Sequence, residues 1–497
     1  MRARRGLTMD YSFIYDPKKP ESIESYAKKM IGKSFKQIDE ESVFDLYIKS
    51  PGFENERRKG GVGNLVEERF FGYRMNSDSE PDFKEAGVEL KVTPYEVKQD
   101  GRKSAGERLV LTMISYKDPV EFDIYKSHYW HKCHLILLVY YLRDRKKESN
   151  LDYRIDYVKL FTPPPDDMAI IEQDYRKIVN KICAGKADEL SESDTMYLGA
   201  CTKGATAAKS FAIQYYPPNT PARRRAFCYK TSYMTYVLNK YIIGDVDTYE
   251  RIVQNVDSLE HQSFEELITE KINIHAGKTD KELCEQFNRE YNNNKAQWID
   301  LAYRMLGIKS NKAEEFIKAN IVVKAVRIEE NGSMVESSPL PQIEFKKMAE
   351  ENWEDSELHD YFEETKFFFV VFKRSGNQYI LQGCKLWNMP NSDLNITVKE
   401  GWQHIKDIVV DGIKFEKKDT AKGIVIKNNL PAKSDNRIIH IRPHAQKSFY
   451  RLKDGYNVGN NSYDGDELPD GQWMTKQSFW LNNSYVIEQL QDIITKS

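Results

Sequence analysis

Cysteine is scarce in this 497-residue chain, and its six cysteines are scattered without a single CxxC pair. A disulfide framework and a cysteine-based zinc site both need cysteines at short, regular spacings, so the sequence argues against both and fits a reducing cytoplasm. No apolar segment follows the basic N-terminal residues, and no stretch approaches about 18 uninterrupted apolar residues. We therefore expect no signal peptide and no membrane span, and a cytoplasmic protein.

Net charge is nearly absent as well, since 74 basic residues face 76 acidic ones and the formal charge is −2. This balance neither supports nor excludes a polyanionic partner, because acidic surface elsewhere can offset a basic cleft. Hydrophobic residues make up 40% of the chain, which favours a packed globular protein over a disordered one. The length exceeds what one ordinary core holds, so two or three domains are expected.

Three short segments recur in the same order along the chain, at slowly growing separations. The pairs are 82–91 with 315–324, 207–211 with 445–449, and 230–242 with 476–490. The recurrence predicts a duplicated domain with loop insertions: a first domain over 1–247, a polar linker over 248–260 and a second domain over 261–497. The alternative is one large α/β domain whose segments resemble each other by coincidence.

The segment GVELKVTPY (87–95) predicts a β-strand with charged residues on one face. Alternation puts Leu90 among the apolar residues, whereas Glu89 and Lys91 share the polar face. Asp82 lies just upstream, where a turn could bring it alongside. Two carboxylates can hold a hard cation such as Mg²⁺ together with water and a substrate phosphate. A lysine beside that water can orient it, or act as a base if its pKa is lowered.

The second copy differs at these positions, with Glu315 in place of Asp82 and Val322 in place of Glu89, while Lys324 remains a lysine. Because valine cannot ligate a cation, we expect the second copy to be non-catalytic. Taken alone, the D-x6-E-x-K spacing is weak evidence of a nuclease. Glutamate and lysine also alternate on the solvated faces of ordinary strands.

Motifs around the strand are more specific. K-G-x-x-G-x-L-x-E begins at Lys59, PDFKEAGVELKVTP spans 81–94, and SHYWHK at 127–132 leads into an apolar run. In this order they resemble the MutH mismatch-repair endonuclease. The chain also resembles the Sau-type restriction endonucleases, which cut GATC. The resemblance lies in its two-copy length and in the segments ELSESDTMYLGACTKGA (189–205) and WMTKQSFW (473–480).

The resemblance implies a mixed α/β fold (a mixed α+β sheet) with a restriction-endonuclease-like PD-(D/E)xK core and two tandem similar domains. It implies that Asp82 and Glu89 ligate Mg²⁺ and that Lys91 serves the attacking water. Glu67, at the end of the first motif, would be an additional acidic residue supporting the metal site. Lys132 would be a second lysine near the scissile phosphate; the alternative is a solvated lysine before a buried strand.

Contacts to double-stranded DNA are expected from basic residues after the catalytic strand. The segment 200–211 aligns with the MutH segment that enters the DNA groove, which puts Lys203 at a base-contacting position. A charge run downstream and the equivalent segments of the second copy supply further candidates: Arg223, Arg224, Arg225, Lys230, Arg442, His444 and Lys476. The alternative for the charge run is a solvated loop.

We therefore expect a type II restriction endonuclease that hydrolyses double-stranded DNA at GATC with Mg²⁺. Its non-catalytic second domain would bind a second GATC site and stimulate cleavage at the first. Survival of the host would demand a cognate DNA methyltransferase, with no direct contact implied. The alternatives are a GATC nickase of the mismatch-repair type and a non-enzymatic DNA-binding protein on a dead nuclease fold.

Overall fold

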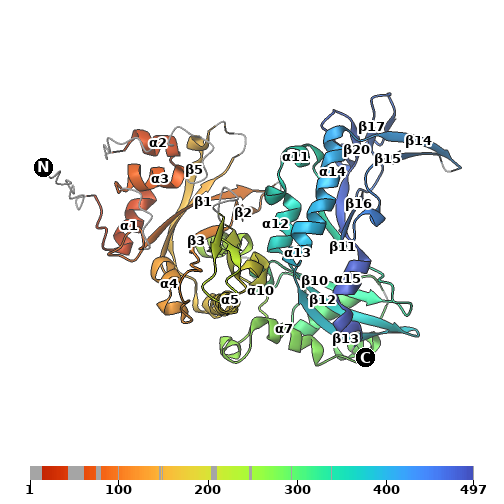
Figure 1. Cartoon of the computed structure of the whole chain (residues 1–497), viewed down its shortest axis with the longest axis horizontal. Coiled ribbons are helices and arrows are strands. Elements are labelled where there is room, and N and C mark those ends of the chain that lie inside the picture. The colour runs from red at the N-terminus through yellow and green to blue at the C-terminus, as the bar shows by residue number, and fades with distance from the viewer. Residues whose placement is uncertain are drawn as a thin grey trace. The chain divides into compact units, whose positions relative to one another are not determined.

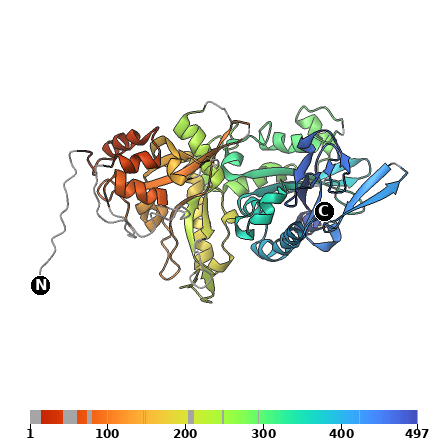
Figure 2. The ribbon, with the colours of Figure 1, turned by 90° about the horizontal axis from the view of Figure 1, so that it is seen from above.

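The computed structural model of the chain describes residues 14–42, 61–73, 80–98, 100–144, 147, 149–202, 210–245, 249–292, 294–336, 338–421 and 423–495. They form two compact units. Unit 1 holds the described parts of 1–249 with 253–263 and 317–320, and unit 2 holds 250–252, 264–316 and the described parts of 321–497. Figures 1 and 2 colour unit 1 mostly red to yellow-green and unit 2 mostly green to blue.

The central sheet of unit 1 has the order β2-β1-β4-β5. Its strands are β1 (Glu89–Val97), β2 (Lys103–Ala105), β4 (Ile136–Leu142) and β5 (Arg154–Phe161). Strands β1 and β4 run parallel, with Glu89 opposite Ile136 and Lys91 opposite Leu138, and the other pairs are antiparallel. The predicted strand at 87–95 is therefore confirmed, and its charged residues lie at its start.

Three short helices pack on one face of this sheet: α1 (Pro20–Ala27), α2 (Phe35–Glu40) and α3 (Gly61–Leu65). A proline in its first turn starts α1, and a capping box between Ser34 and Gln37 starts α2. Helix α3 continues into a π-helical turn, η2 (Val66–Phe70). The shared core includes Phe35, Leu65 and Leu90, so the apolar face predicted for β1 packs on these helices, and Glu89 on the opposite face is buried as well.

A second sheet in unit 1 has the antiparallel order β3-β9-β6. Its strands are β3 (Leu109–Met113), β6 (Leu198–Thr202) and β9 (Arg225–Tyr229). The remaining elements are α4 (His128–Cys133), α5 (Pro165–Cys183), the hairpin β7 (Phe211–Ile213) and β8 (Pro221–Arg223), and α6 (Thr231–Tyr236). Because β9 is the middle strand, its side chains are enclosed; all five of its residues are buried.

Unit 2 contains a sheet of order β10-β12-β13 and another of order β11-β21-β16. These strands are β10 (Ile321–Ile328), β11 (Ser338–Gln342), β12 (Lys366–Ser375), β13 (Gln378–Trp387), β16 (Ile439–Pro443) and β21 (Gln477–Leu481). The hairpin β14 (Phe415–Thr420) and β15 (Gly423–Asn428) is separate, as is a small sheet of β17 (Tyr450–Arg451), β18 (Asn457–Val458), β19 (Gly465–Glu467) and β20 (Trp473–Thr475).

The helices of the second half of the chain surround these sheets (Figure 1). They are α7 (Phe264–Asn273), α8 (Asp280–Gln286), α9 (Gln297–Leu306), α10 (Glu314–Ala319, whose last residues count with unit 1), α11 (Phe345–Glu350), α12 (Glu357–Glu364), α13 (Asn391–Asp393), α14 (Lys399–Asp411), α15 (Asn483–Gln489) and α16 (Gln491–Ile494). Searched over the described residues, the chain has no helix with the length and apolar character of a membrane span.

The two units share one strand plan. In unit 2 the parallel pair β10-β12 followed by antiparallel β13 repeats β1-β4 followed by β5. The order β11-β21-β16 repeats β3-β9-β6, with the last strand of each set in the middle. The predicted fold class, mixed α/β with two tandem similar domains, is confirmed. The predicted boundaries at 247 and 261 stay a prediction.

Candidate active site

A tight turn brings Asp82 back beside β1. Phe83 and Val88 form an isolated antiparallel bridge, so residues 84–87 reverse the chain. Gly87 has a φ of 66°, and a Cβ there would lie 3.1 Å from the His134 ring. As a result, an Asp82 carboxylate oxygen (Oδ2) accepts a hydrogen bond from Leu90 N at 2.8 Å. The six residues between the two acids are therefore the bridged pair, Phe83 and Val88, and the four-residue turn that joins them.

Glu89, Lys91 and Lys132 meet at the start of β1. Lys91 Nζ lies 2.7 Å from Glu89 Oε1, and Lys132 Nζ, from the last turn of α4, lies 3.8 Å from the same oxygen. Ser127 caps α4 by accepting from Trp130 N, which fixes where Lys132 emerges. The geometry thus gathers three of the five predicted catalytic side chains around one carboxylate.

The Glu89 carboxylate is 3% exposed, and its second oxygen, Oε2, is buried with no hydrogen-bond partner in the described part of the chain. Burial raises the pKa of Glu89; Lys91 opposes this shift and Asp82 reinforces it. Burial acts to lower the pKa of Lys91, but Glu89, Cys133 and Asp82 together more than offset it, so the pKa lies above its usual value. Lys91 is therefore held as a cation by its acidic neighbour.

Glu67 is the carboxylate that the helix presents to this cluster. Burial raises its pKa to about 7, the carboxylates of Asp82 and Glu89 add to the shift, and Lys91 opposes it. The structure thereby separates Glu67 from its neighbour Glu68, which sequence periodicity does not distinguish. Glu67 and Glu89 each have a pKa raised by burial and by the neighbouring Asp82 carboxylate, which indicates a place where positive charge is missing.

The donor set fits Mg²⁺, which prefers oxygen ligands and keeps several waters. One oxygen of Glu89 is buried and without a partner among the residues described, and one oxygen of Asp82 is already held by the strand. Among the residues that the structure describes, no three histidine, cysteine or acidic side chains are grouped closely enough to hold a metal ion by themselves. That result matches a cation held by one or two carboxylates, with water and phosphate completing its shell, rather than a closed protein cage.

Tyr73 belongs to this cluster and was missed by the sequence reasoning. Its ring contacts Phe83 with centroids 5.3 Å apart, and its backbone N–H donates to Glu67 O at 3.2 Å. The buried hydroxyl interacts electrostatically with Asp82, Glu67 and Glu89. The only signal in the sequence is its place directly after Gly72, where an aromatic residue reads as ordinary core.

The predicted DNA contacts of unit 1 divide into three groups. Arg223 and Arg224 are exposed, at the end of β8 and just after it. Lys203 lies outside the described residues. The prediction that Arg225 and Lys230 contact phosphate from the surface is wrong: they are 3% and 0% exposed and donate to Ala200 O and Thr195 O. Arg225 lies on the enclosed middle strand and Lys230 directly follows it, so both turn inward.

In unit 2, Arg442 and His444 are exposed and Lys476 is partly so. The Arg442 guanidinium stacks 3.9 Å from the ring centre of Trp480, and His444 hydrogen-bonds Ser478 at 2.9 Å. Stacking holds the guanidinium flat and leaves its edge for other partners. Arg442 lies on β16, His444 directly follows that strand, and Lys476 directly precedes β21.

No matching cluster of carboxylates and lysines lies at the start of β10 among the described residues of unit 2. Val322 packs against the hydrophobic core, and the Glu315 carboxylate, aligned with Asp82 in sequence, accepts from Ile252 N at 3.1 Å. The strand contact that Asp82 makes in unit 1 is made here by Asn311, which accepts from Val323 N at 3.2 Å. An amide thus replaces the acid that holds the strand.

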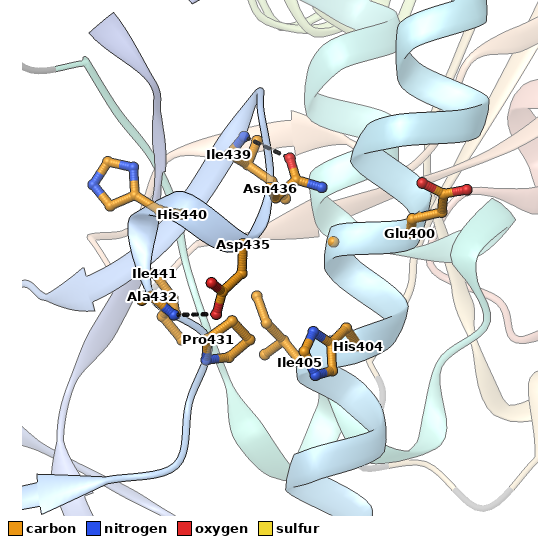
Figure 3. Close-up of a pocket in the computed structure, with 11 residues that line it drawn as sticks. Glu400, His404, Ile405, Pro431, Ala432, Asp435, Asn436, Ile439, His440 and Ile441 are labelled. Carbon is orange, nitrogen blue, oxygen red and sulfur yellow. Dashed lines mark hydrogen bonds between the residues drawn. The ribbon is translucent and has the colours of Figure 1, made fainter. Parts of the chain in front are cut away.

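A pocket of about 180 Å³ in unit 2 lies between α14 and the segment before β16 (Figure 3). Two of its polar side chains hold the local fold: Asp435 accepts from Ala432 N, and Asn436 accepts from Ile439 N. His404 projects toward it from α14 (Figure 3). The pocket therefore shows no carboxylate–lysine arrangement like that around Glu89.

Comparison with known proteins gives two kinds of match. The family model described as DNA mismatch repair enzyme MutH matches residues 71–174. The type II restriction enzyme Sau3AI of Staphylococcus aureus is 34% identical over 95% of this chain and 99% of its own. The DNA mismatch repair proteins MutH of Shewanella sp. (strain W3-18-1) and Shewanella oneidensis are 28% and 27% identical, each over 37% of this chain and 80% of their own.

Proposed function

This chain belongs to the family of MutH-like type II restriction endonucleases and is a site-specific deoxyribonuclease, and we propose that it cuts both strands of double-stranded DNA at GATC with Mg²⁺. The observation that supports the metal and the site is the meeting of Asp82, Glu89 and Lys91 at the start of β1, with a buried oxygen of Glu89 lacking a protein partner among the described residues. Its DNA substrate places the reaction in the cytoplasm.

Asp82 and Glu89 would hold the cation, and Glu67 adds negative charge beside them. A bound Mg²⁺ would polarise the scissile phosphate and make a bound water more acidic. Lys91, whose pKa lies above its usual value beside Glu89, would donate a hydrogen bond that orients the attacking water. Lys132 supplies a second positive charge for the phosphate as negative charge grows on it.

Replacement of the first acid tests the proposal. Asp82→Ala removes a proposed ligand and should abolish Mg²⁺-dependent cleavage of GATC-containing plasmid while leaving duplex binding measurable. Glu85→Ala is the matched control, because Glu85 lies in the same turn but pairs with Lys18 on the surface at 2.7 Å. Full cleavage by Asp82→Ala would refute the site, and equal loss in both variants would point to a damaged turn.

For unit 2 we propose a second, regulatory GATC site and a non-catalytic copy of the fold, with domains over 1–247 and 261–497. Arg442 and His444 are exposed, which supports DNA binding by unit 2. Lys324 has no acidic partner among the described residues, because Val322 stands where unit 1 has Glu89, and this supports a lack of cleavage. A plasmid with one GATC should be cut more slowly than one with two, and added GATC duplex should restore the rate. Arg442→Ala should weaken that rescue, whereas Arg437→Ala, which loses a surface pair with Glu488, should not. Equal rates on both plasmids would remove the effector site.

A GATC nickase is the second candidate, because the MutH family model covers the catalytic segment. Supercoiled plasmid separates the two: a restriction enzyme yields linear DNA, whereas a nickase leaves open circles. Double-strand cutting also requires that host DNA be protected, so we propose a cognate methyltransferase that acts on GATC without contacting this chain.

A further inference from the structure

The Tyr73 hydroxyl is buried and has no hydrogen-bond partner among the residues that the structure describes. Its ring packs on Phe71 and Phe83, with centroids 6.2 and 5.3 Å away. Phenylalanine would fill the same space without burying a polar group, which is unfavourable when no partner is present. Packing alone therefore gives no reason for the hydroxyl.

Acidic side chains surround this hydroxyl. The hydroxyl interacts with the carboxylates of Asp82 and Glu67, and a phenol O–H can donate a hydrogen bond to either of them. Of the two Asp82 oxygens, Oδ2 already accepts from Leu90 N. The other Asp82 oxygen takes no hydrogen bond from the described residues. It can therefore accept one from the Tyr73 hydroxyl, which also has no partner among them.

Unit 2 shows what the same backbone carries where the acids are missing. In unit 2, helix α9 is followed by Gly307, with a φ of 81°, and then by Ile308. In unit 1, η2 is followed in the same way by Gly72, with a φ of 74°, and then by Tyr73. Both following residues donate their N–H back to a helix carbonyl, Ile308 to Tyr303 O and Tyr73 to Glu67 O. The position therefore accepts a buried aliphatic side chain, and the hydroxyl is present only beside the carboxylates.

We propose that Tyr73 is a positioning residue of the metal site, whose hydroxyl donates to the second oxygen of Asp82 and holds that carboxylate toward the cation. The inference rests on the proposed nuclease function. Tyr73 does not touch the reacting atoms; it limits the rotation of Asp82, whose other oxygen is fixed by the strand. A fixed carboxylate loses less conformational freedom when it binds Mg²⁺ than a rotating one does.

The test uses the full chain and measures Mg²⁺ binding by calorimetry, separately from cleavage. Tyr73→Phe should weaken Mg²⁺ binding about tenfold, as expected for loss of one hydrogen bond to a charged group. Its melting temperature without Mg²⁺ should fall little, because the Asp82 carboxylate is only partly buried and water can replace the lost donor. Tyr95→Phe is the matched control: Tyr95 lies on β1 and donates to Asp156 at 2.6 Å, so its loss should lower the melting temperature and leave Mg²⁺ binding unchanged.

Unchanged Mg²⁺ affinity in Tyr73→Phe would overturn the inference, as would a fall in melting temperature equal to that of Tyr95→Phe. The wild-type chain and Asp82→Ala distinguish this failure from failure of the proposed function. If the wild type binds Mg²⁺ and cuts DNA, Asp82→Ala does neither, and Tyr73→Phe matches the wild type, then only the role of Tyr73 is wrong. If the wild type neither binds Mg²⁺ nor cuts, both fall.

Discussion

Strands β1 and β10 hold the same place in their units, yet only β1 carries a complete set of charged side chains. In β1, Glu89 bonds Lys91, whereas in β10 the residue two positions before Lys324, Val322, packs on the core. Both strands nevertheless pair in parallel with their neighbours along their lengths. Backbone pairing and apolar packing thus specify the strand, and the acidic residues are required by the chemistry rather than by the fold.

The two lysines show the same difference in their charge. The pKa of Lys91 lies above its usual value because Glu89, with Cys133 and Asp82, outweighs burial, while burial alone acts on Lys324 and lowers its pKa. A partly buried lysine keeps its proton readily only when a carboxylate is near. Without the glutamate, the charged form of the neighbouring lysine is no longer stabilised by an acid, and its burial destabilises the folded chain.

The largest effect should come from making β1 like β10. Glu89→Val removes a proposed ligand and the partner of Lys91, and we expect cleavage to fall by about 10³-fold or more. Glu89→Gln keeps the shape but loses the charge, so it should lose a similar amount. Plasmid cleavage at saturating Mg²⁺ measures both. Retained activity in Glu89→Gln would mean that shape, not charge, matters at this position.

Much of the difference between β1 and β10 could be predicted from the sequence, because it depends on local sequence patterns. Alternation along 87–95 fixes the faces of β1, and a short turn brings Asp82 to Leu90. The sequence alone shows that the second copy lacks one metal ligand, because it has Val322 where the first copy has Glu89. Resemblance to known motifs, rather than periodicity, singled out Glu67 and Lys132.

The remainder depends on tertiary placement that local patterns do not encode. The charge run at 223–230 does not say that β9 becomes a middle strand, so Arg225 and Lys230 were placed on the surface although both are buried. Sequence alignment pairs Asp82 with Glu315, whereas the strand contact is made by Asn311, which lies earlier in the chain. Tyr73 reads as core because nothing local reveals that its hydroxyl faces carboxylates.

A smaller effect follows from Glu67, whose pKa of about 7 exceeds the usual value near 4.5. Between these two values the folded chain holds a proton that the unfolded chain has lost, so stability without Mg²⁺ should fall as the pH rises through this window. Mg²⁺ competes with that proton and should stabilise the chain more at pH 8 than at pH 5.5.

Thermal unfolding over this pH range, with and without Mg²⁺, checks the prediction. Glu67→Gln cannot ionise and should lose most of the pH dependence contributed by the site. Glu68→Gln, one residue along the same turn, should keep it. If the two variants behave alike, the acidic cluster does not include Glu67 in the way the structure indicates.

The smallest effect, and the sharpest for the comparison, is a difference in sign. Lys91→Met should destabilise unit 1 by about 1–3 kcal/mol, because it leaves the buried Glu89 carboxylate without its main partner. Lys324→Met should instead stabilise the chain by up to about 1 kcal/mol, since a partly buried ammonium with a lowered pKa is replaced by an apolar side chain of similar length. Melting temperatures at pH 7 without Mg²⁺ should therefore move in opposite directions, by a few degrees each. Two shifts of the same sign would mean that the neighbouring acid does not determine what each lysine contributes.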